Sequence, residues 1–274
     1  MRSASLVPKL LALCLCLSAV ATLRAQTDTH TLAKQAAFIF SGEVENAQAA
    51  AKMDLRLPPQ SVLVRVVEVL YVKATTAVRP GDLVIVQMPE RVLPSAQKRA
   101  VFYTNGWIYG QHLTVREVGH VVQEASREEL KQEIAQAKVE AEDDQIRERL
   151  ADAEVVLAGA VKSVRPFEEA RKVSPVSEHD ADWWLAEITV KRFLAGKAGN
   201  KTVLVAYPNS HDVMWADSPK FKAGEEGVWI LHRPRNQRIF ENVKEPVYTA
   251  INRRDFQETK ETERVMRLLK PQTK

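Results

Sequence analysis

The chain has 274 residues, of which 45% are hydrophobic, 27% charged and 7% aromatic, and its formal net charge at pH 7 is +4. This composition excludes a collagen-like chain, a wholly disordered chain and a disulfide-knotted miniprotein. The length accommodates one large domain or two domains of about 100 residues each.

Residues 1–25 have the layout of a secretory signal peptide, with basic residues first, then an apolar run and then small residues. The apolar run, 10–20, is shorter than the roughly 20 residues that a membrane-spanning helix needs, although a retained anchor is the alternative. Small residues allow cleavage after Ala21 or after Ala25, and the sequence leaves that choice open. We therefore expect an exported protein, periplasmic or extracellular, with no membrane span after cleavage.

Cys14 and Cys16 are the two cysteines of the chain, and both lie in the apolar run. Lipid attachment to one of them is an alternative to simple cleavage, but each follows a leucine where a small residue is expected. A chain cut after Ala25 contains no cysteine, so it has no disulfide, thiolate metal site or cysteine nucleophile. Cleavage also removes three basic residues and no acidic one, which lowers the net charge to about +1 and argues against a nucleic-acid partner.

Residues 26–124 are expected to form the first of two β units. Apolar and charged residues alternate over 62–69, which favours a half-buried strand, and the sequence Arg-Pro-Gly-Asp at 79–82 predicts a turn. Asn105-Gly106 predicts a tight two-residue hairpin. Five short strands without a parallel βαβ rhythm indicate a small antiparallel barrel or sandwich.

Residues 125–152 are expected to form a helix that joins the two units. Ser126 is followed three residues later by Glu129, the pattern of a capping box. The apolar residues that share one helical face are Leu130, Ile134, Ala137 and Ala141. This face drifts at Asp143-Asp144, where we expect a bend or a break.

Residues 153–251 repeat the pattern of the first unit. "FIFSGEVENA" from Phe38 resembles "VVLAGAVKSV" from Val155, and "DLVIVQMPE" from Asp82 resembles "KTVLVAYPN" from Lys201. The blocks keep their order and similar spacing, which indicates an internal duplication, with a chance match of generic strands as the alternative.

The last segment, 252–274, is predicted to contain a helix from Asp255 to Leu269 that Pro271 ends. The predicted fold class is therefore mainly β with flanking helices. It consists of two small antiparallel OB-like barrels joined by a long helix, with a second helix at the C-terminus.

The second unit contains the strings "AEVVLAGAV", "RFLAG", "KTVLVAYP" and "FKAGEEGVWIL". In these it resembles bacterial exported domains of the TIMP-like, netrin-module-like OB-barrel class, here as a tandem copy. The resemblance is better over about 150–235 than over about 32–122, and it implies an OB-type fold and a protease inhibitor. Tissue inhibitors of metalloproteinases bind the target zinc through an N-terminal cysteine, which the cleaved chain lacks, so no inhibitory residue is assigned.

The best cluster for metal chemistry lies in the loop at 165–182. An imidazole and three carboxylates there could hold a divalent cation weakly, from the side chains of Glu178, His179, Asp180 and Asp182. A solvated loop is the interpretation that we favour, so no metal and no cofactor are expected. The chain has no HExxH, GxSxG, P-loop or GxGxxG motif, and the consecutive residues 210–212 (Ser-His-Asp) cannot align as a triad. No catalytic residue is therefore assigned.

Five aromatic residues are candidates for partner binding: Trp107, Tyr109, Trp183, Trp184 and Trp215. Exposed aromatic rings stack on sugars or anchor protein partners, although filling of the barrel cores is the alternative. Trp183 and Trp184 are neighbours on a predicted strand, so we expect one to face inward and the other outward. The loops at 46–60 and 165–182 occupy the same place in each unit, beside the face where OB-type barrels bind ligands.

We therefore predict an exported, non-catalytic binding or interaction protein, not an enzyme. Its partner is expected to be a protein or a glycan in the cell envelope or outside the cell. One alternative is an extracytoplasmic protease inhibitor, and another is a weak metal-dependent enzyme that uses the His179 loop. The sequence leaves the identity of the partner and the oligomeric state open.

Overall fold

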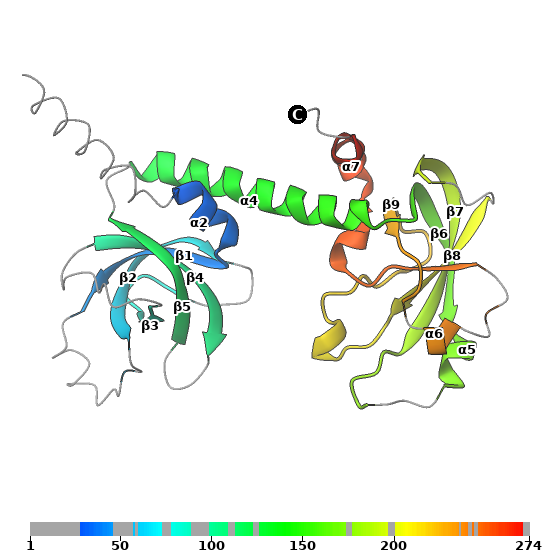
Figure 1. Cartoon of the computed structure of the whole chain (residues 1–274), viewed down its shortest axis with the longest axis horizontal. Helices are drawn as coiled ribbons and strands as arrows, with labels where there is room; N and C mark the ends of the chain where they lie inside the picture. Colours follow the sequence, from blue (N-terminus) through cyan, green and yellow to red (C-terminus); the bar gives the residue numbers. More distant parts are fainter. Residues whose placement is uncertain are drawn as a thin grey trace, which may run out of the picture. The chain divides into compact units, whose positions relative to one another are not determined.

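The computed structural model describes residues 28–45, 57, 60–72, 78–88, 99–108, 113–122, 126–173, 177–196, 201–235, 237–240, 243 and 246–270 (Figure 1). The side chains of residues 107, 108, 237 and 238 are not part of this description. The chain divides into two compact units inside the long helix α4 (Arg127–Ala151). Unit 1 extends to Ala141 and unit 2 begins at Glu142.

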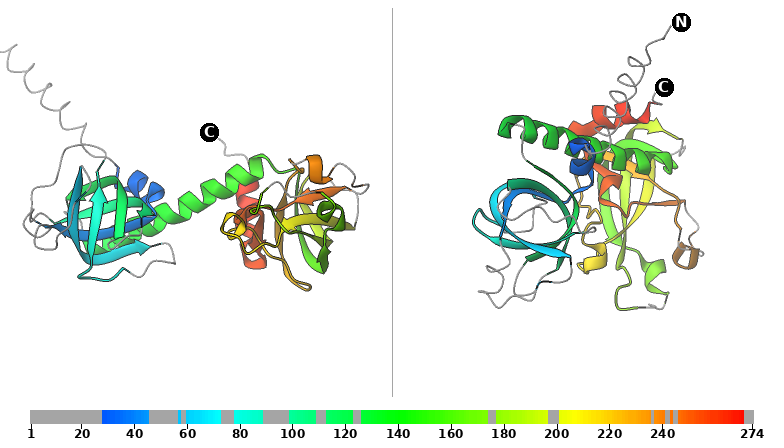
Figure 2. Two further views of the ribbon diagram at one scale, coloured as in Figure 1. Left: turned by 90° about the horizontal axis from the view of Figure 1, so that it is seen from below. Right: turned by 60° about the vertical axis from the view of Figure 1, so that its left-hand side comes forward.

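Unit 1 is a closed β-barrel with a short helix, α2 (Thr29–Gln35), beside it (Figure 2). Its strands are β1 (Phe38–Val44), β2 (Ser61–Val72), β3 (Leu83–Gln87), β4 (Arg99–Ile108) and β5 (Leu113–Val122). They follow one another around the barrel in the order β1-β2-β3-β5-β4, and β4 pairs with β1 to close it. The β3–β5 pair is parallel and the other pairs are antiparallel, so the barrel is OB-like.

Alternate residues of β1 separate the inside of this barrel from its outer face. The rings of Phe38 and Phe40 stack inside the barrel at 4.7 Å, and Phe102 of β4 stacks on Phe40 at 5.4 Å. Ile39 and Tyr103 belong instead to a second buried cluster, in which α2 and the first half of α4 pack on the barrel. Because side chains alternate along a strand, β1 contributes to both clusters.

Unit 2 contains an open sheet in the order β10-β8-β7-β6-β9-β11. Its strands are β6 (Val155–Pro166), β7 (Trp183–Ala195), β8 (Thr202–Pro208), β9 (Glu226–Leu231), β10 (Val247–Thr249) and β11 (Phe256–Glu258). β10 is parallel to β8, and the other pairs are antiparallel. An isolated bridge between His232 and Thr249 joins the end of β9 to the end of β10. The sheet therefore curls towards a barrel. Among the described residues, this one bridge joins the ends of β9 and β10.

Short helices and the C-terminal helix complete unit 2. They are α5 (Glu168–Arg171), η2 (Val213–Trp215), α6 (Gln237–Phe240), η3 (Arg253–Asp255), η4 (Thr259–Glu261) and α7 (Thr262–Leu269). Ile146 of α4 and Val265 of α7 pack with Ile230 of β9 on one face of the sheet. The opposite face carries a larger core that includes Leu157 and Trp229.

The two units share a glycine in the first strand, at a bulge against the second strand. The register shifts between Ser41 and Gly42 in unit 1 and between Ala158 and Gly159 in unit 2. A Cβ atom on Gly159 would lie 2.6 Å from the carbonyl oxygen of Thr189, and one on Gly42 would collide with a neighbouring side chain of β2. The internal similarity of the sequence thus corresponds to a repeated close approach of two strands.

The predicted fold class is confirmed, with a mainly β chain, OB-like β units, a long connecting helix and a C-terminal helix. The capping box is present, because the Glu129 amide donates to the Ser126 hydroxyl at 3.3 Å and the Ser126 amide donates to the Glu129 carboxylate at 3.2 Å. Of the bend or break expected at Asp143-Asp144, the break is wrong, since α4 continues to Ala151. Asp143 is instead buried and accepts hydrogen bonds from Arg264 and Arg267 of α7.

Two local predictions are also wrong. Asn105-Gly106 is not a hairpin, because β4 runs through it with a register shift. The Asn105 side chain accepts from the Ala37 amide at 2.6 Å and donates to the Gln35 carbonyl at 2.9 Å, so it caps the end of α2. The predicted helix from Asp255 begins only at Thr262, because residues 256–258 form β11 and pair with β9.

Candidate functional site

The predicted metal cluster in the loop between β6 and β7 does not converge on one point. The imidazole of His179 contacts Asp212 at 2.9 Å through Nδ1 and Glu178 at 3.7 Å through Nε2. The carboxylate of Asp182 accepts from the indole of Trp184 at 2.8 Å, and the Asp180 amide donates to a backbone carbonyl in the same loop. Within the described residues, no group of three His, Cys, Asp or Glu side chains could hold a metal ion.

The His179 loop is attached to the turn at η2. Asp212 caps η2 by accepting from the Met214 amide at 2.7 Å, and hydrogen bonds from His179 and from that amide hold the pKa of Asp212 below its usual value. The indole of Trp215 donates to the carbonyl oxygen of His179 at 2.7 Å. The polar residues of this loop therefore fix the position of a turn.

The predicted aromatic residues have different surroundings. Trp183 is buried on one face of the sheet, 6.1 Å from Trp215 and 5.7 Å from Phe240 between ring centroids. Trp184 lies on the opposite face, as expected for neighbours on a strand, but it is half-buried against the main core instead of pointing outward. The side chain of Trp107 and all of Tyr109 lie outside the described residues. Of the described residues among these candidates, Trp215 lines a cavity.

A cavity of about 420 Å³ in unit 2 has Trp215 in its lining. The second half of α4, η2 with the residues after it, the segment after β9 and the turn between β10 and η3 contribute to its wall. The lining residues are Gln145, Arg149, Met214, Trp215, Asp217, Ser218, His232, Arg233, Arg235, Thr249, Ile251, Asn252 and Arg253. Four of these are arginines and one is an aspartate, so cations predominate in the lining.

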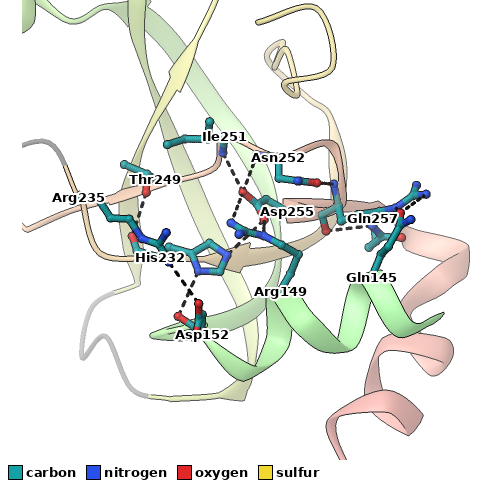
Figure 3. A network of polar contacts seen from close by, with 11 residues as sticks. Gln145, Arg149, Asp152, His232, Arg235, Thr249, Ile251, Asn252, Asp255 and Gln257 are labelled. Carbon is teal, nitrogen blue, oxygen red and sulfur yellow. Dashed lines mark hydrogen bonds and ion pairs between the residues drawn. The ribbon is translucent and has the colours of Figure 1, made fainter. Parts of the chain in front are cut away.

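Asp255, below the lining, is fully buried and accepts hydrogen bonds from several donors (Figure 3). Arg149 donates to both of its oxygens, at 2.7 and 3.1 Å, and the amides of Ile251 and Asn252 donate at 2.8 and 2.9 Å. Burial alone would raise the pKa of Asp255, but the hydrogen bonds from His232, Arg149 and the Asn252 amide lower it below its usual value. The carboxylate therefore stays ionised and fixes the floor of the cavity.

His232 connects this floor to the sheet. Its Nε2 contacts Asp255 at 3.2 Å, and its Nδ1 contacts the carbonyl oxygen of Asp152 at 3.1 Å. Its backbone exchanges two hydrogen bonds with Thr249, at 3.1 and 2.9 Å. Because both ring nitrogens face acceptors, both contacts are hydrogen bonds only when both nitrogens carry a proton.

The arginines at the mouth of the cavity are exposed. Arg233 pairs with Glu154 at 2.7 Å, and Arg235 pairs with Asp152 at 3.2 Å. Exposed ion pairs of this kind contribute little to stability because solvent screens them, so a ligand can compete for these guanidinium groups. Arg253 forms no ion pair with any residue that the structure describes.

Sequence reasoning missed this cavity because its residues are far apart along the chain. Arg149 and Asp255 are 106 residues apart, and His232 and Asp255 are 23 apart. The one available signal was the basic character of 232–235 and 252–254. These segments follow two strands that the His232–Thr249 bridge joins.

No known protein-family profile and no curated protein sequence matches this chain. None of the described helices is long and apolar enough to cross a membrane.

Proposed function

We propose that this chain is an exported, non-catalytic binding protein that captures an anionic ligand in the cavity of unit 2. The observation that carries the proposal is the exposed guanidinium of Arg253, which shares the mouth of the cavity with Arg233 and Arg235. Guanidinium groups bind carboxylates and phosphates through paired hydrogen bonds. The cavity volume also falls in the range of about 300 to 1,000 Å³ that is usual for ligand sites.

The cavity is well suited to binding because its floor is already ordered. The lining residue Arg149 is neutralised by the buried Asp255, so a ligand does not have to organise these two groups. The indole of Trp215 and the side chains of Met214 and Ile251 add apolar surface to the wall. A ligand with one anionic group and one apolar part would therefore use both kinds of surface.

Export and family remain parts of the same proposal. The layout of residues 1–25 supports export, with cleavage after Ala21 or Ala25. The OB-like strand order supports the resemblance to exported TIMP-like domains as a proposal about ancestry.

The experiment is a calorimetric titration of the chain 26–274 with succinate and with inorganic phosphate. We expect saturable binding to one site, and the double variant Arg235→Gln/Arg253→Gln should bind about tenfold or more weakly, a loss of about 1.4 kcal/mol. Arg192→Gln, which removes an exposed arginine of β7 away from the cavity lining, is the matched control. Equal binding by the double variant, or no binding of either anion, would contradict the proposal.

A further inference from the structure

Two exposed apolar side chains lie in η2, where Met214 lines the cavity and Val213 precedes it in the chain. Val213 is 81% exposed and Met214 is 67% exposed, and both belong to η2. Met214 and Trp215 also line the cavity, so the apolar surface continues from the mouth into the wall. Large apolar side chains that face solvent beside a pocket are typical of an interaction surface.

Several hydrogen bonds hold the η2 turn in place. The exposed side chains of Val213 and Met214 therefore stand on an ordered segment. Asp212 accepts from the Met214 amide, and its carbonyl oxygen accepts from the Trp215 amide at 2.9 Å. The ammonium of Lys220 donates to the Trp215 carbonyl at 3.0 Å, and the Trp215 indole packs near Trp183. A surface that is fixed before binding loses little conformational entropy when a partner docks.

Charge decides what kind of partner fits this surface. Met214 lines the cavity together with the exposed Arg235 and Arg253, and the exposed Val213 precedes Met214 in η2. Asp217 is the acidic side chain among the described lining residues. A partner therefore needs carboxylates for the arginines and an apolar group for η2.

We infer that the cavity and η2 together form a docking site for an acidic peptide segment in which an apolar side chain lies beside carboxylates. This inference rests on the proposed function and specifies its ligand. A peptide supplies both groups at fixed spacing along one chain. The carboxylates pair with Arg235 and Arg253 while the apolar side chain covers Val213 and Met214.

The test uses three amidated and acetylated five-residue peptides and the chain 26–274. The first peptide has a leucine between two glutamates, the second replaces the leucine by serine, and the third replaces the glutamates by glutamines. Binding is measured by calorimetry for the unchanged chain and for Val213→Ser/Met214→Ser. Val139→Ser, at an apolar position of α4 that is 54% exposed and lies outside the cavity lining, is the matched control.

We expect the leucine–glutamate peptide to bind about tenfold tighter than either of the other peptides. Val213→Ser/Met214→Ser should reduce its affinity to that of the serine peptide, and Val139→Ser should leave it unchanged. All of these substitutions are at exposed positions, and circular dichroism will show whether the variants fold.

Three results would overturn the inference. If the leucine and serine peptides bind equally and depend on Arg253, the proposed anion site stands and the apolar docking surface is wrong. If none of the peptides and neither small anion binds, both proposals fail. If an acidic oligosaccharide such as oligogalacturonate binds more tightly than the peptides and ignores the η2 substitutions, the partner is a glycan.

Discussion

Asp255 is the residue on which the floor of the cavity depends. It is fully buried, and its donors come from α4, from the end of β9 and from the turn before η3. A buried carboxylate without partners would carry a desolvation penalty of several kcal/mol, which the surrounding donors offset here. The ionised carboxylate thus connects α4, the end of β9 and the turn before η3 through its hydrogen bonds.

We expect Asp255→Asn to lower the free energy of unfolding by about 3 kcal/mol, because it leaves Arg149 partly buried without its counter-charge. Urea denaturation followed by tryptophan fluorescence measures this change. Asp217→Asn, which alters an exposed aspartate of the cavity lining, is the control and should change stability by less than about 0.5 kcal/mol. Equal effects of the two substitutions would contradict the role given to Asp255.

The same residue predicts a dependence on pH. The pKa of Asp255 in the folded chain lies below its ordinary value of 3.8, so the folded state binds this proton less readily than the unfolded state does. Its contribution to stability is therefore complete above pH 3.8 and is lost as the pH falls through the lower folded-state value. Stability measured from pH 6 to pH 2 should fall less steeply for Asp255→Asn than for the unchanged chain; parallel curves would count against this assignment.

The first strand of each unit requires a glycine at one position, because the next strand lies too close for a Cβ atom. Gly42 and Gly159 occupy equivalent bulges where the next strand leaves no room for a Cβ atom. In unit 2 the obstacle is the carbonyl oxygen of Thr189, which belongs to the backbone and cannot rotate away. This close approach allows β6 to pair with both β7 and β9 while the sheet curls.

Gly159→Ala should therefore lower the free energy of unfolding by about 1 to 3 kcal/mol through steric overlap. Gly81→Ala is the informative comparison, because Gly81 has φ of +95° but nothing within 4 Å of the added methyl group. It should cost only the backbone strain of about 1 kcal/mol. Thermal denaturation of both variants measures the difference, and a harmless Gly159→Ala would mean that the strands can separate without loss.

The elements with strong local signals were predictable and those set by distant partners were not. The capping box at Ser126 and the repeated strand blocks depend on neighbouring residues, and both are present. Asn105 was misread because its side chain bonds to backbone atoms 68 and 70 residues away. The residues at 256–258 were assigned to a helix because their pairing with β9 is invisible in a local pattern. The cavity was not predictable from local patterns, because its floor forms only when Asp255 and Arg149, 106 residues apart, are brought together.

At the level of the complete chain, α4 contributes to the core of each unit. Leu130 and Ile134 belong to the outer cluster of unit 1, and Ile146 belongs to a cluster of unit 2. Residues of this helix thus belong to the core of each unit, and within unit 2 its Asp143 pairs with Arg264 and Arg267 of α7. If the proposed signal peptide is removed on export, the remaining chain has no cysteine. It must then fold without the disulfides that stabilise many exported proteins.

We expect the exported chain to begin at Thr22 or at Gln26, as determined by intact-mass measurement of protein from the cell envelope or the medium. Its thermal unfolding should be the same with and without a reducing agent, because no cysteine remains. A mass that includes residues 1–21, or one increased by lipid, would contradict simple cleavage.

The binding of an anion at the mouth of the cavity is tested most directly by nitrogen-15 NMR of the arginine side chains during a titration with succinate. The account predicts that the Nε–H signals of Arg235 and Arg253 shift in a saturable way while that of Arg192 does not. Uniform small shifts of all arginine signals, or no shift at Arg253, would contradict it.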